Sequence, residues 1–461
     1  MNDLSTWRID PALTRILLET PELGCAYLVG GCVRDALLDL PGKDYDVEVF
    51  GLDADALVRT LSRWGRVDVV GQSFGVVKLT VAEGDTYDFS LPRRDSKVAS
   101  GHRGFEVQFD ATLDPEAASA RRDYTVNALM FDVRRRELLD YQGGLADLKN
   151  RVLRHVGPAF AEDPLRVLRG MYLAARLGFD PAPETVDLCR SIKASYAELA
   201  VERVREEWFK WAARGRVPSA GLRFLAATEW LDHFPEIQAM SGVGQDPEWH
   251  PEGDVLTHTG HCCDALALDP GWRAADAETR VVLMLAVLLH DSAKPLTTQS
   301  VMRDGRMRIV SPGHDVVARS LVDSFLGRLR APQAILQRVP PLVAHHLAHL
   351  NPITDKSVRR LAKRLEPETI EHLGRVIAAD YAGRPPRPPV VSEAVRQLLA
   401  KADEMRVAAQ APQPILRGRH LIEWGLLPGP AMGQILAAAF EAQLDGEFQD
   451  LEGARLWFGR R

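Results

Sequence analysis

Short apolar stretches separated by glycine mark the first 150 residues of this 461-residue chain. Five of these stretches are each five or six residues long and rich in β-branched and aromatic residues, as expected of strands. They lie at 25–29, 45–50, 66–70, 76–81 and 86–91. Helical periodicity is expected near 33–40 and 53–64. The pattern therefore predicts a mixed α/β unit at the start of the chain.

The pattern changes after about Gly144, where the strand signal disappears and helical periodicity takes over from Leu165 through Trp230. A link rich in Gly, Asp and Pro at 241–254 opens a second helical region that is rich in histidine. The segment RPPRPP at 384–389 cannot continue a helix. We therefore predict four domains, the last three of them helical, at 1–150, 151–240, 241–385 and 386–461.

Composition and charge narrow the class of protein. The chain is 46% hydrophobic and 26% charged, as in globular proteins, and its net charge of −6 leaves any nucleic acid to be held by local basic patches. The longest apolar run, Val281–Leu289, has nine residues, about half of what a bilayer requires. Five cysteines without a C-x-x-C pair fit reduced thiols. We expect a soluble, cytoplasmic protein that does not enter a membrane.

A glycine turn with a nearby arginine follows the first predicted strand. Gly30 and Gly31 lie between this strand and a helix, where a glycine backbone can approach a phosphate closely. Arg34 supplies a forked donor to the same phosphate oxygens. The sequence therefore predicts a phosphate site at this turn.

Two aspartates that begin ten residues after Arg34 indicate metal chemistry. Side chains at i and i+2 of a strand point to the same face, so Asp44 and Asp46 can hold two divalent cations side by side. Asp88, in the predicted strand TYDFSL, is the best candidate for a third acid. Carboxylate oxygens suit Mg²⁺, and such a site serves in-line phosphoryl or nucleotidyl transfer.

The segment RRDYTVN at 121–127 offers further groups for a nucleotide. Arg122 is a phosphate donor, and Asp123 and Asn127 can bind a ribose or a phosphate. Taken alone, the segment fits the charged start of a solvated helix equally well.

The segment EDPLRVLR at 162–169 offers groups for a base. Asp163 is an acceptor beside the donor Arg166, which matches the edge that cytosine and adenine share and that uracil and guanine reverse. The alternative is a plain helix start, with Asp163 as N-cap and Glu162 paired with Arg166.

Taken together, GGCVRD, DYD, RRDYTVN, YQGGLADL and EDPLRVLR resemble, in order and spacing, the motifs of the class II tRNA nucleotidyltransferases. These are the CCA-adding enzymes, with the bacterial poly(A) polymerases as close relatives. The resemblance covers roughly residues 25–215, including VERVREEWFK at 201–210. It implies a polymerase-beta-like head, a helical neck that reads the incoming base, and a helical body and tail for tRNA.

By position, the resemblance implies a role for each matching residue. Asp44 and Asp46 would bind the metal ions, and Lys43 completes the Lys-Asp-x-Asp that is common in the family. Asp88 stands where relatives often carry Glu. The implied nucleotide ligands are Gly31, Arg34 and Arg122 for the triphosphate, Asp123 for the ribose, and Asp163 and Arg166, supported by Arg169, for the base.

The histidine-rich half carries a second metal pattern. Four residues follow the order His, His-Asp, Asp of the HD phosphohydrolase superfamily, which implies that they bind a divalent metal: His258, His290, Asp291 and Asp380. Imidazole and carboxylate ligands suit a transition metal such as Ni²⁺, Co²⁺ or Mn²⁺. His314, His345 and His346 are candidates to support a second ion.

Bacterial CCA-adding enzymes with an HD domain behind the neck provide a parallel for this layout. In some of them the HD domain hydrolyses 2′,3′-cyclic phosphates and nucleotides. The resemblance therefore implies a phosphohydrolase, with a retained HD fold that has little or no catalysis as the alternative.

The sequence thus predicts an enzyme that adds C, C and A to the 3′ end of tRNA from CTP and ATP and releases pyrophosphate. One alternative has the same head but adds only CC or only A, or polymerises A. Another is an HD phosphohydrolase whose head merely binds a nucleotide, although the intact Asp44-x-Asp46 pair argues against it.

Overall fold

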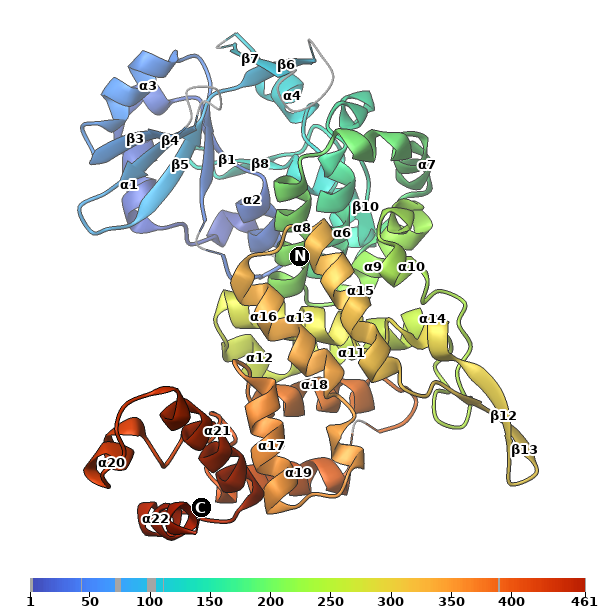
Figure 1. The fold of residues 1–461 in the computed structure, drawn as a ribbon. Coiled ribbons are helices and arrows are strands. Elements are labelled where there is room, and N and C mark those ends of the chain that lie inside the picture. Colours follow the sequence, from blue (N-terminus) through green and yellow to red (C-terminus); the bar gives the residue numbers. More distant parts are fainter. Residues whose placement is uncertain are drawn as a thin grey trace. The chain divides into compact units, whose positions relative to one another are not determined.

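The computed structural model describes residues 3–42, 44–70, 76–97, 105–110, 112–388 and 390–460. The chain divides into two compact units, which can be followed in Figure 1. The first comprises Met1–Glu207 and Arg223–Trp230, and the second comprises Trp208–Leu222 and Leu231–Arg461.

A seven-stranded mixed sheet occupies the N-terminal part of the first unit. Its strands, in spatial order, are β3 (Arg66–Val70), β4 (Val76–Thr80), β5 (Thr86–Ser90), β2 (Asp46–Val49), β1 (Ala26–Val29), β8 (Met130–Asp132) and β9 (Glu137–Leu139). Strands β2 and β5 pair in parallel, and the other neighbours in this sheet are antiparallel. All five strands predicted from the sequence are present, whereas β8 and β9 were not predicted.

Five helices in the described part of the chain accompany this sheet. They are α1 (Pro11–Glu19), α2 (Gly31–Leu37), α3 (Ala54–Leu61), α4 (Pro115–Ser119) and α5 (Gly144–Asn150). Helices α1, α3 and α4 begin at aspartate caps. Asp53 begins α3 by accepting a hydrogen bond of 2.7 Å from the Ala56 amide, as an N-cap does. Strands β6 (Arg93–Lys97) and β7 (Phe105–Phe109) pair antiparallel in a separate two-stranded sheet.

The helical part of the first unit starts with α6 (Leu165–Leu177) and α7 (Pro183–Ser191). Two short strands, β10 (Val152–Leu153) and β11 (Asp180–Pro181), flank α6 and pair in parallel. Gly170 permits close packing of α6, because a Cβ there would lie 2.1 Å from Tyr124 Oη and 2.5 Å from the Phe224 ring. Helices α8 (Val201–Arg214) and α9 (Pro218–Ala227) belong partly to each unit.

The second unit is mainly helical. Its helices are α10 (Pro235–Gln238), α11 (Val255–Leu268), α12 (Pro270–Ala274), α13 (Ala277–Leu289), α14 (Lys294–Thr297), α15 (His314–Arg328), α16 (Gln333–Ala344), α17 (Asp355–Leu365), α18 (Ile370–Ala382), α19 (Glu393–Glu404), α20 (Gly418–Glu423), α21 (Pro430–Asp445) and α22 (Leu451–Gly459). The apolar run of α13 is buried throughout. Among the described helices, none combines the length and the apolar character that crossing a membrane requires.

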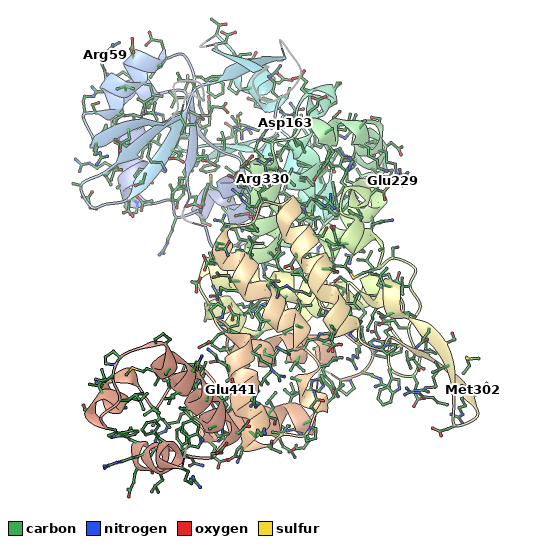
Figure 2. The ribbon with its side chains drawn as sticks, viewed as in Figure 1. Arg59, Asp163, Glu229, Met302, Arg330 and Glu441 are labelled. Carbon is green, nitrogen blue, oxygen red and sulfur yellow. The ribbon has the colours of Figure 1, made fainter. Side chains whose placement is uncertain are left out.

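One hairpin in the second unit corrects the prediction that strands end after Gly144. Strands β12 (Gln299–Arg303) and β13 (Arg306–Val310) pair antiparallel across a turn at Asp304 and Gly305, whose φ angles are 49° and 74°. The hairpin buries little apolar surface, and Met302, labelled in Figure 2, is 65% exposed. It therefore lacks the buried face on which the sequence prediction relied, although an Asp-Gly pair is a hairpin signal.

Candidate nucleotide site and candidate metal cluster

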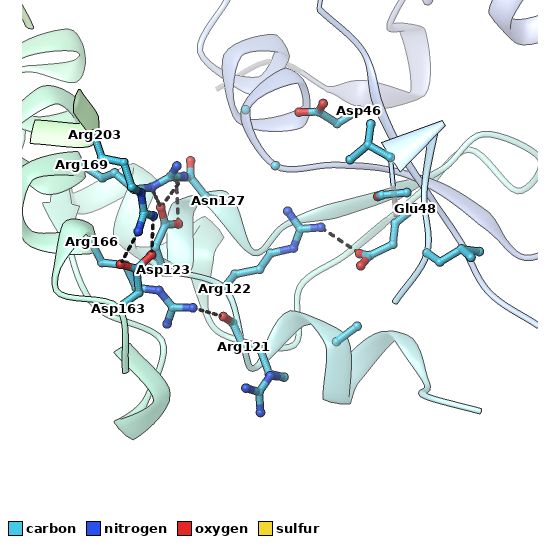
Figure 3. A pocket seen from close by; sticks show the side chains of 16 residues that line it. Asp46, Glu48, Arg121, Arg122, Asp123, Asn127, Asp163, Arg166, Arg169 and Arg203 are labelled. Carbon is cyan, nitrogen blue, oxygen red and sulfur yellow. Dashed lines mark hydrogen bonds and ion pairs between the residues drawn. The ribbon is translucent and has the colours of Figure 1, made fainter. Parts of the chain in front are cut away.

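A cavity of about 440 Å³ lies in the first unit, lined by residues of the sheet, the 121–127 segment and the start of α6 (Figure 3). We call it the nucleotide cavity. It brings together most of the predicted nucleotide ligands: Gly30, Gly31, Arg122, Asp123, Asn127, Asp163, Arg166 and Arg169, along with Asp46. Arg34, Asp44 and Asp88 do not line it, and Lys43 lies outside the described residues.

The turn between β1 and α2 needs glycine at its first position. Gly30 has a φ of 72°, a left-handed conformation that side chains rarely adopt. A Cβ at this position would also lie 3.2 Å from Arg122 Nη1. The glycine therefore lets Arg122 approach the backbone of the turn.

Three aspartates lie on or next to the parallel strands β2 and β5. Asp46 and Asp88 are register partners on the parallel strands β2 and β5, and Asp44 lies two residues before Asp46. Desolvation raises the pKa of Asp46, and although Arg122 opposes this rise, the Asp88 and Asp44 carboxylates increase it. Neighbouring carboxylates that repel one another fit a divalent cation, and Lys78 Nζ, 3.5 Å from Asp88, neutralises only part of this charge.

A fourth acid, on β2, was not predicted. Glu48 lies two residues after Asp46 and lines the nucleotide cavity. It accepts a hydrogen bond of 2.8 Å from Arg122 Nη2, which extends across the cavity toward β2 in Figure 3. The i, i+2 spacing of Asp44, Asp46 and Glu48 in the sequence was a signal that could have revealed it, and the last two of these residues lie on β2.

Arg34 lies behind the glycine turn and not in the cavity. Its buried guanidinium donates to Asp35 Oδ1, from Nε at 2.8 Å and from Nη2 at 2.6 Å, and to the side-chain oxygen of Asn127. Asp35 also binds Arg176 of α6 at 2.6 Å. In this structure Arg34 therefore links the turn to α6 through buried ion pairs.

Asp123 is the centre of a second buried group. Its carboxylate accepts from Arg169 Nε at 2.7 Å, from Asn127 Nδ2 at 3.1 Å and from the Tyr124 amide at 2.8 Å. Burial alone would raise the pKa of Asp123, but the Arg169 cation and these hydrogen bonds lower it to about 2. Asp123 is therefore held as an anion at the wall of the cavity.

The residues expected to read a base are close together and already have partners. Asp163 Oδ2 accepts from Arg203 Nη2 at 3.0 Å (Figure 3), and Asp163 Oδ1 accepts from the Leu165 amide at 3.2 Å. Arg166 donates to the carbonyls of Ala159 at 2.8 Å and of Arg121 at 2.9 Å. Those two carbonyls fix the plane of the guanidinium.

The structure also corrects one detail of the plain helix-start interpretation. Glu162 pairs with Arg121 at 3.2 Å, and Arg166 binds backbone carbonyls in its place. Arg203, which belongs to the VERVREEWFK segment, was not predicted as a site residue. Its contact spans 40 residues of sequence, so local spacing gave no signal for it.

The second unit gathers the four residues of the predicted HD metal site. His258 Nε2 lies 3.1 Å from Asp380 Oδ1 and 3.6 Å from Asp291 Oδ2, and His290 Nε2 lies 3.2 Å from Asp291 Oδ2. These side chains are all buried, and the His290-Asp291 pair directly follows α13. Buried imidazoles and carboxylates form a donor set that fits a divalent transition metal.

Two of the three additional histidines extend this set. His314 Nε2 lies 3.2 Å from Asp291 Oδ1 and 3.1 Å from His346 Nε2. Burial lowers the pKa of His346 to about 4, which keeps the imidazole neutral, as metal ligation requires. His345 does not belong to this group of possible ligands.

Two residues of the second unit were missed by the sequence prediction. Cys262 lies one helical turn after His258 on α11. Its Sγ and one possible ligand atom from each of His258, His290 and Asp380 all lie within 4.8 Å of one another. Glu252 Oε1 lies 2.7 Å from His258 Nδ1. The i, i+4 spacing of His258 and Cys262 was a usable signal, whereas Glu252 lies on a loop. We call these residues the histidine cluster: Glu252, His258, Cys262, His290, Asp291, His314, His346 and Asp380.

Known proteins resemble the chain over most of its length. Residues 26–154 match the poly(A) polymerase head domain. A multifunctional CCA protein of Xanthomonas campestris pv. campestris (strain B100) is 37% identical over 431 residues, which cover 90% of this chain and 96% of the relative. One from Xylella fastidiosa (strain 9a5c) is 36% identical over 372 residues, covering 78% and 84%.

Solved structures share the fold. The Bacillus stearothermophilus CCA-adding enzyme in complex with CTP aligns over 98% of both chains, with a TM-score of 0.66 and 21% identity. The Thermotoga maritima CCA-adding enzyme complexed with tRNA aligns over 98% of this chain and 96% of its own, with a TM-score of 0.59 and 18% identity.

The mixed sheet, its acidic strand and the head-domain match define a nucleotidyltransferase with a polymerase-beta-like head followed by a helical body. The chain belongs to the family of the multifunctional CCA proteins, within the class II tRNA nucleotidyltransferases. The resemblance and the fold class predicted from the sequence are thereby confirmed.

Proposed function

We propose that this protein adds C, C and A to the 3′ end of tRNA, using CTP and ATP and releasing pyrophosphate. The observation that carries the proposal is that one cavity holds Asp46 of β2 together with Asp163 and Arg166 near the start of α6. Asp46 would serve the transfer chemistry, and Asp163 and Arg166 would select the base. Relatives named multifunctional CCA proteins support the same reaction.

The head residues divide the work of binding and transfer. Asp44 and Asp46 would hold Mg²⁺, with Asp88 in register beside Asp46. A bound cation supplies charge neutralisation at the triphosphate and activation of the attacking 3′ hydroxyl. Arg122 and the backbone of the turn at Gly30 and Gly31 would hold the phosphate oxygens. Asp123 and Asn127 would contact the ribose.

Base choice would follow from an acceptor and a donor at fixed positions. The amino group of C or A would donate to Asp163, and the ring nitrogen would accept from Arg166, which Arg169 supports. Because Arg203 already occupies Asp163 Oδ2, the incoming base competes with or shares this contact. U and G would present an acceptor to the carboxylate, at a cost of about 1–3 kcal/mol.

The decisive experiment supplies each nucleoside triphosphate to tRNA transcripts that end before, within or after CCA. Full addition from CTP and ATP, stopping after A, supports the proposal. Addition of CC alone, of A alone or of an A-tract would instead identify one of the other head activities. No incorporation with any transcript would favour a head that only binds nucleotides.

A matched pair of variants tests the metal assignment in the same assay. Asp46→Ala is expected to abolish incorporation while the melting curve stays close to that of the wild type. Asp68→Ala removes a carboxylate from β3, outside the cavity, and should retain incorporation. Normal turnover by folded Asp46→Ala would overturn the assignment.

We also propose that the histidine cluster binds a transition metal, such as Ni²⁺, Co²⁺ or Mn²⁺, and hydrolyses a phosphoester. The supporting observation is the buried convergence of imidazoles and carboxylates from α11, α18 and the residues around α13, α15 and α16. Metal analysis after supplementation and phosphate release from 2′,3′-cyclic AMP test it. Protein that retains no metal and releases no phosphate would contradict it.

The domain limits and the compartment follow from these proposals. We assign the head to residues 1–150, the neck to 151–240, the HD domain to 241–385 and the tail to 386–461. A tRNA substrate places the enzyme in the cytoplasm, and the five free cysteines fit such a reducing environment.

A further inference from the structure

A second cavity adjoins the histidine cluster in the second unit. It measures about 700 Å³ and shares Asp380 with the cluster. We call it the side cavity. Its aromatic, imidazole and charged lining residues are Trp249, His349, Asp380, Tyr381, Arg384 and Arg387. The cavity therefore joins a group of flat side chains to a ligand of the proposed metal site.

Flat aromatic surfaces in this cavity are paired with guanidinium groups. Trp249 is 51% exposed, and the guanidinium carbon of Arg387 lies 5.3 Å from its ring centroid. The guanidinium carbon of Arg384 lies 5.0 Å from the Tyr381 centroid. Such surfaces bind a nucleobase by stacking, since a base has the same planar shape as the guanidinium and every base presents a π face.

One of the two arginines lies next to the histidine cluster. Arg384 Nη2 donates to Asp380 Oδ1 at 2.6 Å, and Asp380 Oδ1 lies 3.1 Å from His258 Nε2. Arg384 Nε is buried and makes no hydrogen bond to the described residues. Among the charged residues that line the cavity, two are arginines and one is an aspartate, which favours an anionic group in the cavity.

We propose that the side cavity is a base-binding subsite and that Trp249 determines the specificity of the phosphohydrolase for phosphoesters that carry a nucleobase. Trp249 and Tyr381 stack the base, while Arg384 and Arg387 contact the phosphate or ribose oxygens. The proposal rests on the proposed phosphohydrolase function. It predicts selection of nucleotides over phosphoesters that have the same reacting group and no base.

The reaction that this subsite serves is a balanced hydrolysis. For a 2′,3′-cyclic nucleotide, the oxygen of water bonds to phosphorus, and one P–O ester bond to the ribose breaks. The leaving ribose oxygen takes a proton that the water gives up. No oxidant, reductant or second substrate is required.

The test compares two cyclic phosphodiesters on the metal-loaded full-length protein. 2′,3′-cyclic AMP carries a base, and glycerol 1,2-cyclic phosphate does not. Trp249→Ala should lower the ratio of kcat/KM for the first over the second by about tenfold to a hundredfold, the range that loss of one stacked base gives. Trp249→Phe should restore most of the ratio, and Met302→Ala, an exposed change on the β12–β13 hairpin, serves as the control.

The outcomes separate this subsite from the reaction itself. Equal kcat/KM values for the two substrates in the wild type, or an unchanged ratio in Trp249→Ala, would overturn the subsite while the hydrolase remains. Hydrolysis of neither substrate would count against the hydrolase. In that case photolabelling with 8-azidoadenosine 2′-monophosphate decides, because label on the peptides around Trp249 or Tyr381 supports the subsite and label confined to head peptides overturns it.

Discussion

At the scale of single residues, Asp163 offers the sharpest test of base choice. Asp163→Ala should lower kcat/KM for CTP and ATP far more than for UTP and GTP, narrowing a preference of about tens to hundreds-fold. The physical reason is that the carboxylate accepts from an amino group that only C and A present at that edge. Single-nucleotide incorporation with all four triphosphates measures the ratio.

A matched capping variant separates this role from helix stability. Asp276 is the N-cap of α13 and accepts from the Thr279 amide at 2.9 Å, whereas Asp163 lies just before the Pro164 N-cap of α6 and accepts from the Leu165 amide at 3.2 Å. Asp276→Ala should cost about 1 kcal/mol of stability and leave the four incorporation rates in proportion. If Asp163→Ala behaves in the same way, the residue is only a cap.

The low pKa of Asp123 makes a prediction about acid stability. Its pKa is about 2 in the folded protein and about 3.9 in an unfolded chain, so ionised Asp123 stabilises the fold above about pH 4 by about 2 kcal/mol. This contribution is lost as the pH falls toward the folded pKa. The free energy of unfolding of the wild type relative to Asp123→Asn should therefore drop by about 1 kcal/mol between about pH 6 and about pH 3.

Urea titrations at several pH values measure this difference. Asp55→Asn, an exposed change on α3, is the control and should show no such drop. A pH-independent difference between wild type and Asp123→Asn would mean that Arg169 does not stabilise the Asp123 anion.

At the scale of elements, the turn between β1 and α2 can be tested with two glycines. Gly30→Ala places a Cβ in the left-handed region and 3.2 Å from Arg122 Nη1, so we expect about 1–2 kcal/mol of lost stability and a raised KM for CTP. Gly84→Ala also places a side chain at a positive φ, 94°, but has nothing within 4 Å of its Cβ. It should lose stability with an unchanged KM, and equal KM values in both variants would contradict the role of the turn.

Some strands of this protein could be predicted from the sequence alone, and others could not. Five head strands were predictable because each alternates or is apolar over at least five residues, and their observed bounds differ by at most one residue at each end. Strand β8 escaped prediction because it has three residues, all buried, and so presents no alternation. The β12–β13 hairpin escaped it because its strands are mostly exposed and three arginines interrupt their apolar residues.

Among the site residues, those marked by a local sequence pattern were easier to predict than those that meet only through the tertiary fold. Neighbouring residues in the sequence were enough to single out Asp46 and Asp163, which line the nucleotide cavity, and the His290-Asp291 pair, which lies in the histidine cluster, whereas Asp44 does not line the cavity. Arg203 and Glu252 were not predicted, because each meets its partner only after the chain has folded. Arg34 was predicted as a phosphate donor from its position, but the structure pairs it with Asp35 and Asn127 outside the cavity, because its burial depends on tertiary packing.

At the scale of the whole molecule, the two proposed metal sites lie in different compact units. His290→Ala should therefore lower phosphate release by about a hundredfold or more while CCA addition continues at the wild-type rate. His261→Ala removes a histidine of α11 that does not belong to the cluster, and it should affect neither activity.

Metal removal tests the same independence without a mutation. After chelation, Mg²⁺ alone should restore nucleotide addition, whereas phosphate release should return only with Ni²⁺, Co²⁺ or Mn²⁺. Parallel assays on one preparation measure both recoveries. Restoration of both activities by Mg²⁺ alone would argue against a transition-metal site at the histidine cluster.

The hydrogen bonds that run from Arg176 through Asp35, Arg34, Asn127 and Asp123 to Arg169 are buried in the middle of this path and partly buried at its ends, and they constrain how this sequence can evolve. Asp35, Asn127 and Asp123 each have a partner on both sides, so losing one leaves buried polar groups unsatisfied twice. A second replacement in an already broken chain of bonds costs less than it would alone, which makes these positions epistatic. We therefore expect neutral substitutions to accumulate at other positions, and substitutions at these six residues to occur several at a time.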